Sequence, residues 1–154
     1  MEQAVIHAPF GPLTLFAEDG VLIALVFGDY GGYDDLPVFR AAKAQLEEYF
    51  AGQRRSFSLP LRPEGTPFQR RVWQCLCQIP YGQVISYREL AAQVGSPRAF
   101  QAVGQANGRN PLMIVIPCHR VIAAGGGLGG YSGGLDIKRF LLRLEAGLPM
   151  PEDR

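Results

Sequence analysis

The stretch Ile114-Val115-Ile116-Pro117-Cys118-His119-Arg120-Val121-Ile122 places a thiol and an imidazole side by side between two short β-branched runs. The runs predict a buried strand or turn that the polar residues interrupt. Pro117 restricts the backbone that leads into Cys118. His119 and Arg120 are neighbours of the kind that lower the pKa of a thiol, so we expect Cys118 to be reactive. The commoner alternative for a lone cysteine is a buried, inert thiol.

Around this stretch, the 154-residue chain is 47% hydrophobic and 19% charged, which predicts one globular domain or two small ones. Its longest continuous apolar run, residues 21–27, is far shorter than a membrane span, and no signal peptide opens the sequence. We therefore expect a cytoplasmic protein without membrane contact. Three cysteines fit a reducing compartment, and with only two histidines they give no metal-ligand set, so no metal or cofactor is expected.

Charge is divided unevenly along the chain. Residues 1–60 carry 4 basic and 8 acidic side chains, whereas residues 61–154 carry 11 basic and 6 acidic ones. The net charges are −4 and +5, so the second part is the one suited to face phosphate groups. Ordinary surface charge explains an imbalance of this size equally well, and charge alone does not predict nucleic-acid binding.

Residues 1–62 predict a small structural domain made of an antiparallel sheet and a helix. The strand-like segments are residues 4–7, 13–17, 21–27 and 57–61. Asp19-Gly20 is the signal of a tight hairpin turn. A helix over residues 37–50 begins at a proline and ends at Gly52. No chemical motif lies in this part, and we interpret it as a scaffold.

Residues 63–154 predict a mostly helical domain, so the fold class is α/β in the α+β arrangement. The predicted helices cover residues 66–78, 86–93, 97–107 and 136–146. Thr66 and Ser86 each begin a capping box, with Gln69 and Glu89 three residues later. The second and third helices, joined by a turn at Gly95, resemble a helix-turn-helix, although such helical hairpins are also common packing units.

Three segments of this domain resemble the catalytic domain of the O6-alkylguanine-DNA alkyltransferases. They are Asn110-Pro111, Ile116 to Ile122, and Tyr131-Ser132-Gly133-Gly134-Leu135 followed by the helix to Gly147. The resemblance runs in order from Thr66 to Gly147, whereas residues 1–60 are similar to the family's N-terminal domain only in general layout. It implies direct repair of DNA in a single turnover. An alkyl group on O6 of guanine, or on O4 of thymine, moves to Cys118 after the base is flipped out of the duplex.

The resemblance also implies the surroundings of the reaction. The substrate is double-stranded DNA containing alkylated guanine, which the protein would bind through the minor groove. The protein is expected to be a monomer and to associate with the nucleoid when it is bound to DNA. No cofactor takes part. The protein inactivates itself, because a thioether forms and no water step restores the thiol.

Two residues besides the thiol are implied in proton transfer. A thiol with an ordinary pKa of about 8.5 is mostly protonated at neutral pH, so a base is required. His119 is the candidate, acting best through a water molecule, and the resemblance implies that Glu145 polarises it. Taken by itself, Glu145 is typical of a solvated helix residue.

The pocket residues follow from the resemblance in the same way. Tyr87 and Ser132 would hydrogen-bond the guanine, and the Tyr87 hydroxyl would favour the anionic base as the alkyl group leaves. Tyr131 would form a wall, and the backbone at the thiol and at Val121 would read the exocyclic amine. Asn110 would brace the active-site turn. As alternatives, Tyr87 and Ser132 could cap helices, and an Asn before Pro is a common turn former.

The third predicted helix is implied to enter the minor groove. The residues expected to contact DNA are Ser96, Arg98, Gln101, Ala102 and Arg109. Gln101 stands where relatives carry an Arg that fills the gap left by the extruded base. Because Gln is shorter and uncharged, we expect weaker DNA binding or less efficient flipping. Arg98, one turn earlier on the same face, could substitute in part, and so could a hydrogen bond from Gln101 to the orphaned base.

Two other functions fit a neighbouring Cys and His. A thiol hydrolase would form an acyl intermediate and turn over, but the sequence lacks the nucleophile–base–orienter signature of the known hydrolase families. A damage-sensing module would bind flipped lesions without reacting, but that version of the family lacks the cysteine, and Cys118 is present. The mass of the protein after incubation with a methylated oligonucleotide separates the three.

Overall fold

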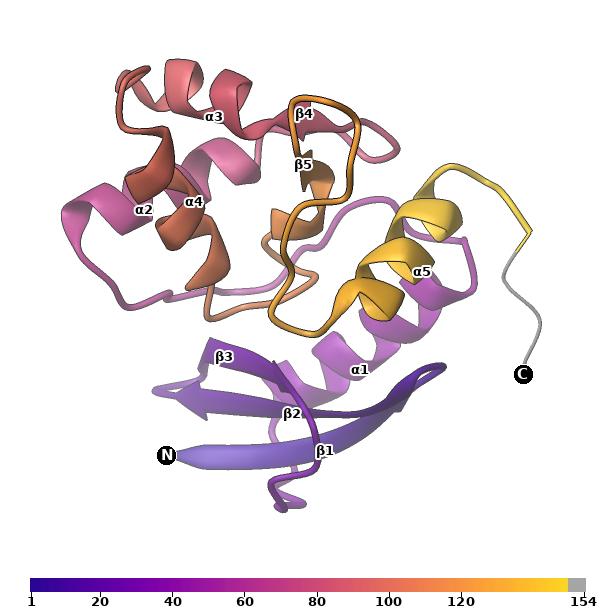
Figure 1. The fold of residues 1–154 in the computed structure, drawn as a ribbon. Helices are drawn as coiled ribbons and strands as arrows, with labels where there is room; N and C mark the ends of the chain where they lie inside the picture. The colour runs from indigo at the N-terminus through magenta and orange to yellow at the C-terminus, as the bar shows by residue number, and fades with distance from the viewer. Residues whose placement is uncertain (150–154) are drawn as a thin grey trace. The chain divides into compact units, whose positions relative to one another are not determined.

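The computed structural model describes residues 1–149, which form two compact units (Figure 1). The first unit contains residues 1–64 and 111–115, and the described part of the second contains residues 65–110 and 116–149. The expected α/β fold is confirmed, with a sheet and a helix in the first unit and mostly helices in the second. Within residues 1–149, every helix is too short or too polar to cross a membrane.

The first unit is built on a three-stranded antiparallel sheet in the order β1-β2-β3. Its strands are β1 (Glu2–Ala8), β2 (Gly11–Glu18) and β3 (Val21–Phe27). The predicted hairpin turn is confirmed, because Glu18 pairs with Val21 and the two residues between them, Asp19 and Gly20, have φ of +52° and +77°. Two positive φ values in a two-residue loop match the twist of the flanking strands.

The expected fourth strand over residues 57–61 is wrong. Only Leu61 makes an isolated parallel bridge, to Leu22 on β3, where Leu22 N–H donates to the carbonyl of Pro60 at 2.9 Å. Prolines have no N–H for a ladder, and Pro60 lies inside the expected strand. The segment therefore touches the sheet edge at one point instead of extending it.

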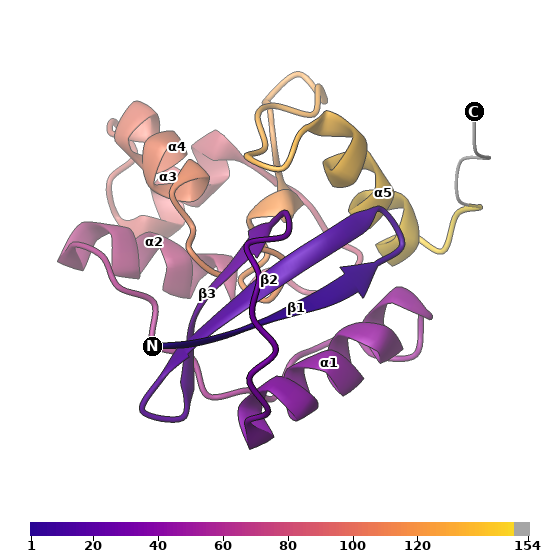
Figure 2. The same ribbon diagram turned by 90° about the horizontal axis from the view of Figure 1, so that it is seen from below.

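Helix α1 (Pro37–Phe50) packs against the sheet and completes the core of the first unit (Figure 2). The predicted helix is present, and its buried positions recur at helical spacing. The core residues that it contributes are Val38, Phe39, Ala42, Leu46 and Tyr49. The helix ends at Phe50, and Gly52, two residues later, has a φ of +75°, the left-handed conformation that a side chain would strain.

The described part of the second unit, which ends at residue 149, contains four α-helices, three of which pack against one another. They are α2 (Pro67–Leu76), α3 (Tyr87–Val94), α4 (Phe100–Gly108) and α5 (Leu135–Glu145). Both predicted capping boxes are present, from Thr66 to Gln69 and from Ser86 to Glu89. The indole N–H of Trp73 donates to the carbonyl of Ala106 at 2.9 Å and joins α2 to α4.

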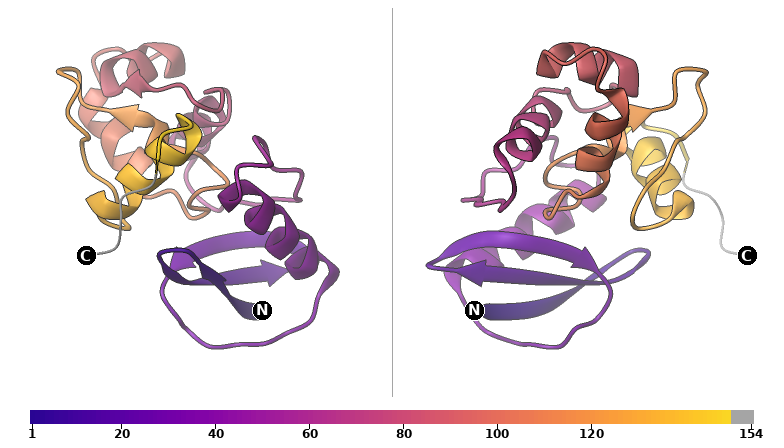
Figure 3. Two further views of the ribbon diagram at one scale, coloured as in Figure 1. Left: turned by 90° about the vertical axis from the view of Figure 1, so that its right-hand side faces the viewer. Right: turned by 60° about the vertical axis from the view of Figure 1, so that its left-hand side comes forward.

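Helices α3 and α4 form the expected helix-turn-helix (Figure 3), but α4 begins later than predicted. The amide of Ala99 donates to the carbonyl of Ser96 at 2.9 Å, which closes a turn over Pro97 and Arg98. Proline is favoured at the second position of such a turn. Arg98 is therefore not one helical turn before Gln101 on the same face, and that expectation is wrong.

Candidate active site

The thiol is presented by a short, tightly turned backbone segment. Pro117 has φ −83° and ψ 63°, and the amide of Cys118 donates to the carbonyl of Ile116 at 2.8 Å, which together form an inverse γ-turn. A 3₁₀ turn, η1 (Cys118–Arg120), follows directly and leads into β5 (Val121–Ile122). The Asn110 side chain donates to the carbonyl of Ile116 at 2.7 Å and fixes the turn from one side.

Strand β5 is held in place by a short parallel pairing with β4 (Ile85–Ser86). The residue after β4 is Tyr87, the first residue of α3. The pairing therefore places the start of α3 beside the chain that leaves the thiol. Two segments more than 30 residues apart in the sequence meet at the site in this way.

Cys118 is buried, with 2% of its surface exposed, and its pKa is raised to about 11. Burial is the largest cause, and it outweighs the hydrogen bond from Asn110 and the positive charge of Lys138, which lower the pKa. The expectation that His119 and Arg120 lower the thiol pKa is wrong. The guanidinium of Arg120 is engaged by a carboxylate instead, so Cys118 is a protonated thiol at neutral pH.

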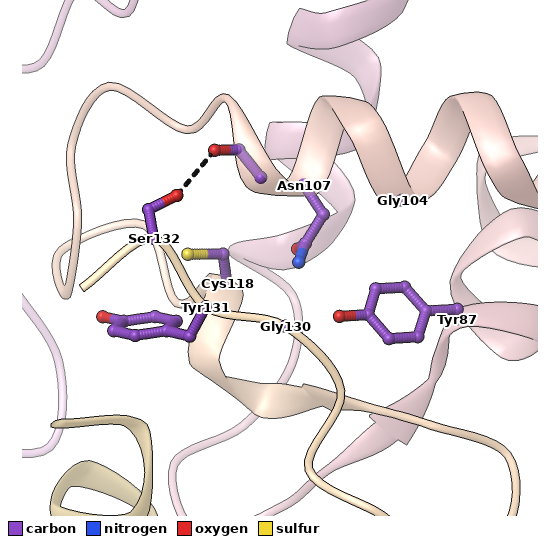
Figure 4. Close-up of a pocket in the computed structure, with 8 residues that line it drawn as sticks. Tyr87, Gly104, Asn107, Cys118, Gly130, Tyr131 and Ser132 are labelled. Atoms are coloured by element: carbon purple, nitrogen blue, oxygen red, sulfur yellow. Dashed lines mark hydrogen bonds between the residues drawn. The ribbon is translucent and has the colours of Figure 1, made fainter. Parts of the chain in front are cut away.

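A cavity of about 280 Å³ opens onto this sulfur (Figure 4). It is lined by Tyr87, Gly104, Asn107, Gly108, Cys118, Gly130, Tyr131 and Ser132. Three of the predicted pocket residues thus lie in its wall, namely Tyr87, Tyr131 and Ser132. Val121 is not among the lining residues. The thiol is therefore buried yet accessible from one side, which distinguishes it from an inert core cysteine.

Tyr87 packs against the glycine-rich loop that follows β5. A Cβ on Gly129 would lie 2.9 Å from the Tyr87 hydroxyl, so only glycine fits there, and its φ of +71° also favours glycine. Burial raises the pKa of Tyr87, a hydrogen bond with the Gly130 backbone lowers it, and the neighbouring Cys118 raises it further. The hydroxyl remains protonated at neutral pH and can donate a proton or a hydrogen bond.

Tyr131 and Ser132 form the opposite part of the cavity wall. The hydroxyl of Ser132 donates to the carbonyl of Gly108 at 2.9 Å, which ties the loop to the end of α4. Burial raises the pKa of Tyr131 well above its usual value, and the charges of Cys118 and Glu145 act in the same direction.

Three charged or titratable side chains form a buried cluster behind the thiol. His119 Nε2 lies 2.7 Å from Oε2 of Glu145. Arg120 donates from Nε to Oε1 of Glu145 at 2.8 Å and from Nη2 to Oε2 at 2.9 Å, so the guanidinium and the carboxylate form a bidentate pair. Its third nitrogen donates to the carbonyl of Ile79 at 2.7 Å. Glu145 is 6% exposed, so its interpretation as a solvated helix residue is wrong.

The charge state of the cluster sets the tautomer of His119. Burial alone would raise the pKa of Glu145, but the hydrogen bonds and charges of His119 and Arg120 lower it to about 2. Burial lowers the pKa of His119 more than Glu145 raises it, so the imidazole is neutral at pH 7. Because an ionised carboxylate only accepts, the single proton sits on Nε2. Nδ1 is then an acceptor, and it has no hydrogen-bond partner within residues 1–149.

Lys138 is a buried residue beside the site that the sequence analysis missed. It lies on α5 with its side chain buried, and its ammonium donates to the carbonyl of Val121 at 2.6 Å and to that of Gly130 at 3.1 Å. It therefore fastens the strand after the thiol to the loop that lines the cavity. A lysine on the apolar side of an amphipathic helix, among Ile137, Leu141 and Leu144, is the signal that could have revealed it.

Asn107 is a second residue that the sequence did not reveal. It lies on α4, is 4% exposed, and lines the cavity. Its Oδ1 is buried and has no hydrogen-bond partner among the described residues. Buried polar atoms are paired in the great majority of cases, so an orphaned acceptor in a cavity wall is unusual.

The five residues expected to contact DNA all lie on α4 or at its ends. Gln101 and Ala102 are exposed on the first turns of the helix, and Arg109 is exposed at its C-cap. Arg98 is exposed in the preceding turn, and Ser96 is half-buried there. Within residues 1–149, no group of three or more His, Cys, Asp or Glu side chains is placed to hold a metal ion.

Comparisons with known proteins cover both units. Residues 1–63 match the ribonuclease-like domain of 6-O-methylguanine DNA methyltransferase, and residues 67–147 match its DNA binding domain. The chain is 49% identical over 153 residues to the methylated-DNA–protein-cysteine methyltransferase of Methanosarcina barkeri, covering 94% of this chain and 97% of the relative. A constitutive enzyme of the same name from Bacillus subtilis is 56% identical over 114 residues, covering 73% and 69%.

A solved structure gives the same result. The Mycobacterium tuberculosis OGT, crystallised in complex with DNA, superposes with a TM-score of 0.88 at 46% identity, covering 96% of this chain and 94% of that one. The resemblance carried by the sequence motifs is thereby confirmed over the length of the chain. This chain belongs to the 6-O-methylguanine DNA methyltransferase family.

Proposed function

We propose that the protein repairs DNA by moving an alkyl group from O6 of guanine, or from O4 of thymine, to Cys118 in a single turnover. The observation that carries the proposal is the sulfur at the wall of an open cavity, backed by a neutral histidine with an unpartnered nitrogen. Family membership supports the same reaction, because the matching relatives are named for transfer of a methyl group from DNA to a protein cysteine.

The reaction begins with activation of a protonated thiol. As the sulfur approaches the alkyl carbon, its proton passes to Nδ1 of His119 through one water molecule. Glu145 accepts the Nε2–H bond and stabilises the imidazolium that forms, while Arg120 keeps the carboxylate ionised. The carbon–sulfur bond forms as the carbon–oxygen bond breaks, and the electron pair of that bond stays on the guanine.

The departing guanine carries the electron pair of the broken bond as an anion, and the imidazolium that holds the thiol proton balances its charge. The Tyr87 hydroxyl lies in the cavity wall with its proton in place and is the group we assign to stabilise the departing guanine. Ser132 and Tyr131 position the base, and Asn110 braces the turn that carries the sulfur. The backbone at Val121 would read the exocyclic amine, although its carbonyl already accepts a hydrogen bond from Lys138. The product is a thioether, which water does not cleave, so each molecule reacts once.

Double-stranded DNA would meet the second unit along α4. Gln101, Ala102 and Arg109 are exposed on this helix or at its C-cap, with Arg98 and Ser96 in the turn before it, and we assign the helix to the minor groove. The base must leave the stack, at a cost of about a few kcal/mol, to reach a thiol that is 2% exposed. We assign residues 1–62 a structural role and residues 63–154 the reaction, in a monomer that works in the cytoplasm and on the nucleoid.

A mass measurement tests the function. The protein is mixed with a duplex containing one O6-methylguanine and weighed intact and after digestion. We expect a gain of one methyl group on the peptide that contains Cys118, with no second turnover when DNA is in excess. The Cys118→Ser variant should bind the duplex and gain no mass. Repeated hydrolysis would identify a thiol hydrolase, and binding without mass gain would identify a lesion sensor.

A further inference from the structure

The second unit has another cavity besides the one at the thiol. Its volume is about 370 Å³, against about 280 Å³ for the thiol cavity, and the two cavities have no lining residue in common. Packed protein interiors leave few voids larger than a water molecule, whereas small-molecule sites occupy about 300–1,000 Å³. The second cavity therefore has the size of a ligand site, and the proposed reaction does not use it.

The wall of this second cavity is mainly aliphatic. It is formed by the chain before β4, by β5 with the loop that follows it, and by the end of α5 with the residues after it. The aliphatic side chains in the wall are Val84, Ile122, Leu128, Leu142 and Leu148. Val84 is 45% exposed and Leu148 is 51% exposed. Because aliphatic surface in contact with water is unfavourable, a ligand that covers these side chains would have to be apolar itself.

A positive charge lies in the same wall, on Arg143. The guanidinium donates from Nε and Nη2 to the carbonyl of Pro149 at 2.9 and 2.6 Å, and within residues 1–149 it forms no ion pair with a carboxylate. Glu145 also lines the cavity, but its carboxylate is bound by His119 and Arg120 and its side chain is only 1% exposed. A neutral carbonyl does not cancel the charge of Arg143, so the wall favours an anionic group.

The loop after β5 forms part of both cavities. Gly126 and Leu128 line the second cavity, and Gly130 lines the thiol cavity. The amide of Ala123 donates to the carbonyl of Gly127 at 2.9 Å, which closes the first part of the loop into a turn. A ligand that packs against Leu128 would therefore stabilise a segment that ends in the wall of the thiol cavity.

We propose that the second cavity is a binding site for a small apolar acid, in which one carboxylate or sulfonate is attached to an aromatic or aliphatic group. The apolar group packs against the aliphatic wall, and the anion meets the guanidinium of Arg143. The bound acid also stabilises the loop of residues 123–130. This site does not depend on the proposed alkyl transfer, because neither DNA nor the thiol takes part in binding.

The test uses two fluorescent probes that differ in charge. Anilinonaphthalene sulfonate carries one sulfonate, and phenylnaphthylamine is the same aromatic amine without it. Titration of the 154-residue chain should show saturable binding of one molecule of each probe. In Arg143→Gln the affinity for the sulfonate should fall by roughly threefold to tenfold, since a charged hydrogen bond is lost, while the affinity for the neutral probe stays the same. Arg139→Gln removes an exposed cation one turn earlier on α5, outside the lining, and should change neither affinity.

A second pair of variants tests the aliphatic wall. Val84→Ser should weaken the binding of both probes by roughly threefold to tenfold, because it removes apolar surface from the wall. Leu135→Ser is the matched control, since Leu135 is also 45% exposed but does not line the cavity. Both substitutions are at exposed positions, so thermal unfolding should change little in either variant.

Hydrogen exchange locates the bound probe independently. In the unaltered protein, saturating anilinonaphthalene sulfonate should slow amide exchange over residues 123–130, and the protection should weaken in Val84→Ser at the same probe concentration. Failure of the unaltered chain to bind the sulfonate would overturn the proposal. Equal binding by Val84→Ser and Leu135→Ser, or protection confined to other segments, would place the probe elsewhere and would overturn it as well.

Discussion

The imidazole of His119 and the carboxylate of Glu145 are 26 residues apart in the chain and 2.7 Å apart in the structure, both buried. Arg120 holds the other edge of the same carboxylate. This arrangement keeps Glu145 ionised and places the imidazole proton on Nε2. The Nδ1 atom on the other side of the ring has no hydrogen-bond partner among the described residues, and in the proposed mechanism it receives the proton of the thiol.

Glu145→Gln should lower both stability and the rate of alkyl transfer. Gln keeps the shape but leaves Arg120 as a buried cation without a counter-charge, and removing one partner of a buried pair lowers the free energy of unfolding by about 3–5 kcal/mol. Chemical denaturation and single-turnover kinetics measure the two effects. Asp136→Asn is the matched control, because its ion pair with Arg139 on the same helix is exposed and contributes little.

The same variant tests the pH dependence of folding. The pKa of Glu145 falls from 4.5 to about 2 in the folded protein. The stability from its ionised form is therefore complete above about pH 4.5 and is lost as the pH falls toward 2. The difference between the protein and Glu145→Gln should shrink over that interval, in denaturation curves recorded at several pH values. A constant difference would show that the carboxylate is not held by its neighbours.

Cys118 should react slowly with iodoacetamide at neutral pH, because burial raises its pKa to about 11. Its labelling rate should still rise by about tenfold per pH unit between about pH 8 and 10, since only the thiolate reacts. Peptide mass spectrometry follows this site separately from Cys75 and Cys77. A rate that levels off near neutral pH would indicate a thiolate stabilised before substrate binds and would remove the need for His119 as a base.

Gly129→Ala should slow alkyl transfer by displacing Tyr87. The added Cβ would lie 2.9 Å from both the ring edge and the hydroxyl of Tyr87. Gly126→Ala is the matched control: its φ of +87° imposes similar backbone strain, of about 1–3 kcal/mol, but nothing lies within 4 Å of the new Cβ. Alkyl transfer should therefore be slower in Gly129→Ala than in Gly126→Ala, while the melting temperatures of the two variants should fall by similar amounts. Equal rates would show that the approach of Tyr87 to the loop is not needed.

Lys138→Met should loosen the loop that lines the cavity. Met fills a similar volume but leaves the carbonyls of Val121 and Gly130 without their donor, at about 1–3 kcal/mol for each unsatisfied group. Faster hydrogen exchange at residues 123–130 and slower transfer are the expected results. Arg139→Met, a neighbouring and exposed cation, should change neither. If the loop stays protected in Lys138→Met, the ammonium does not fasten it.

Gln101→Arg should raise the transfer rate on duplex DNA. A guanidinium is longer than the Gln amide and charged, so it fills the gap left by an extruded base more fully and attracts phosphate groups. Gln105→Arg, exposed on the next turn of α4, adds the same charge and corrects for general attraction to DNA. The transfer rate of Gln101→Arg should exceed that of Gln105→Arg by several-fold, measured from reactions stopped at a series of times with saturating DNA. An unchanged or lower rate would remove the idea that Gln101 limits flipping.

Features that depend on neighbouring residues could be predicted from the sequence. The hairpin at Asp19-Gly20 and the capping boxes at Thr66 and Ser86 are local hydrogen-bonding patterns, and each is present. The order of the motifs around Cys118 was enough to identify the family. Where a local signal was ambiguous it misled, as at Pro97, which is the second residue of a turn and not the start of the helix.

The sequence by itself determined the family, predicted Cys118 as the reactive thiol and predicted the helices of the second unit. Only the tertiary structure decided the electrostatics. It buries Cys118 and so raises the pKa of the thiol. It also pairs the guanidinium of Arg120 with the carboxylate of Glu145 and places the ammonium of Lys138 beside two backbone carbonyls. The reason is that desolvation and charge pairing depend on distances between residues far apart in the chain, such as Arg120 and Glu145. A local pattern carries no measure of those distances.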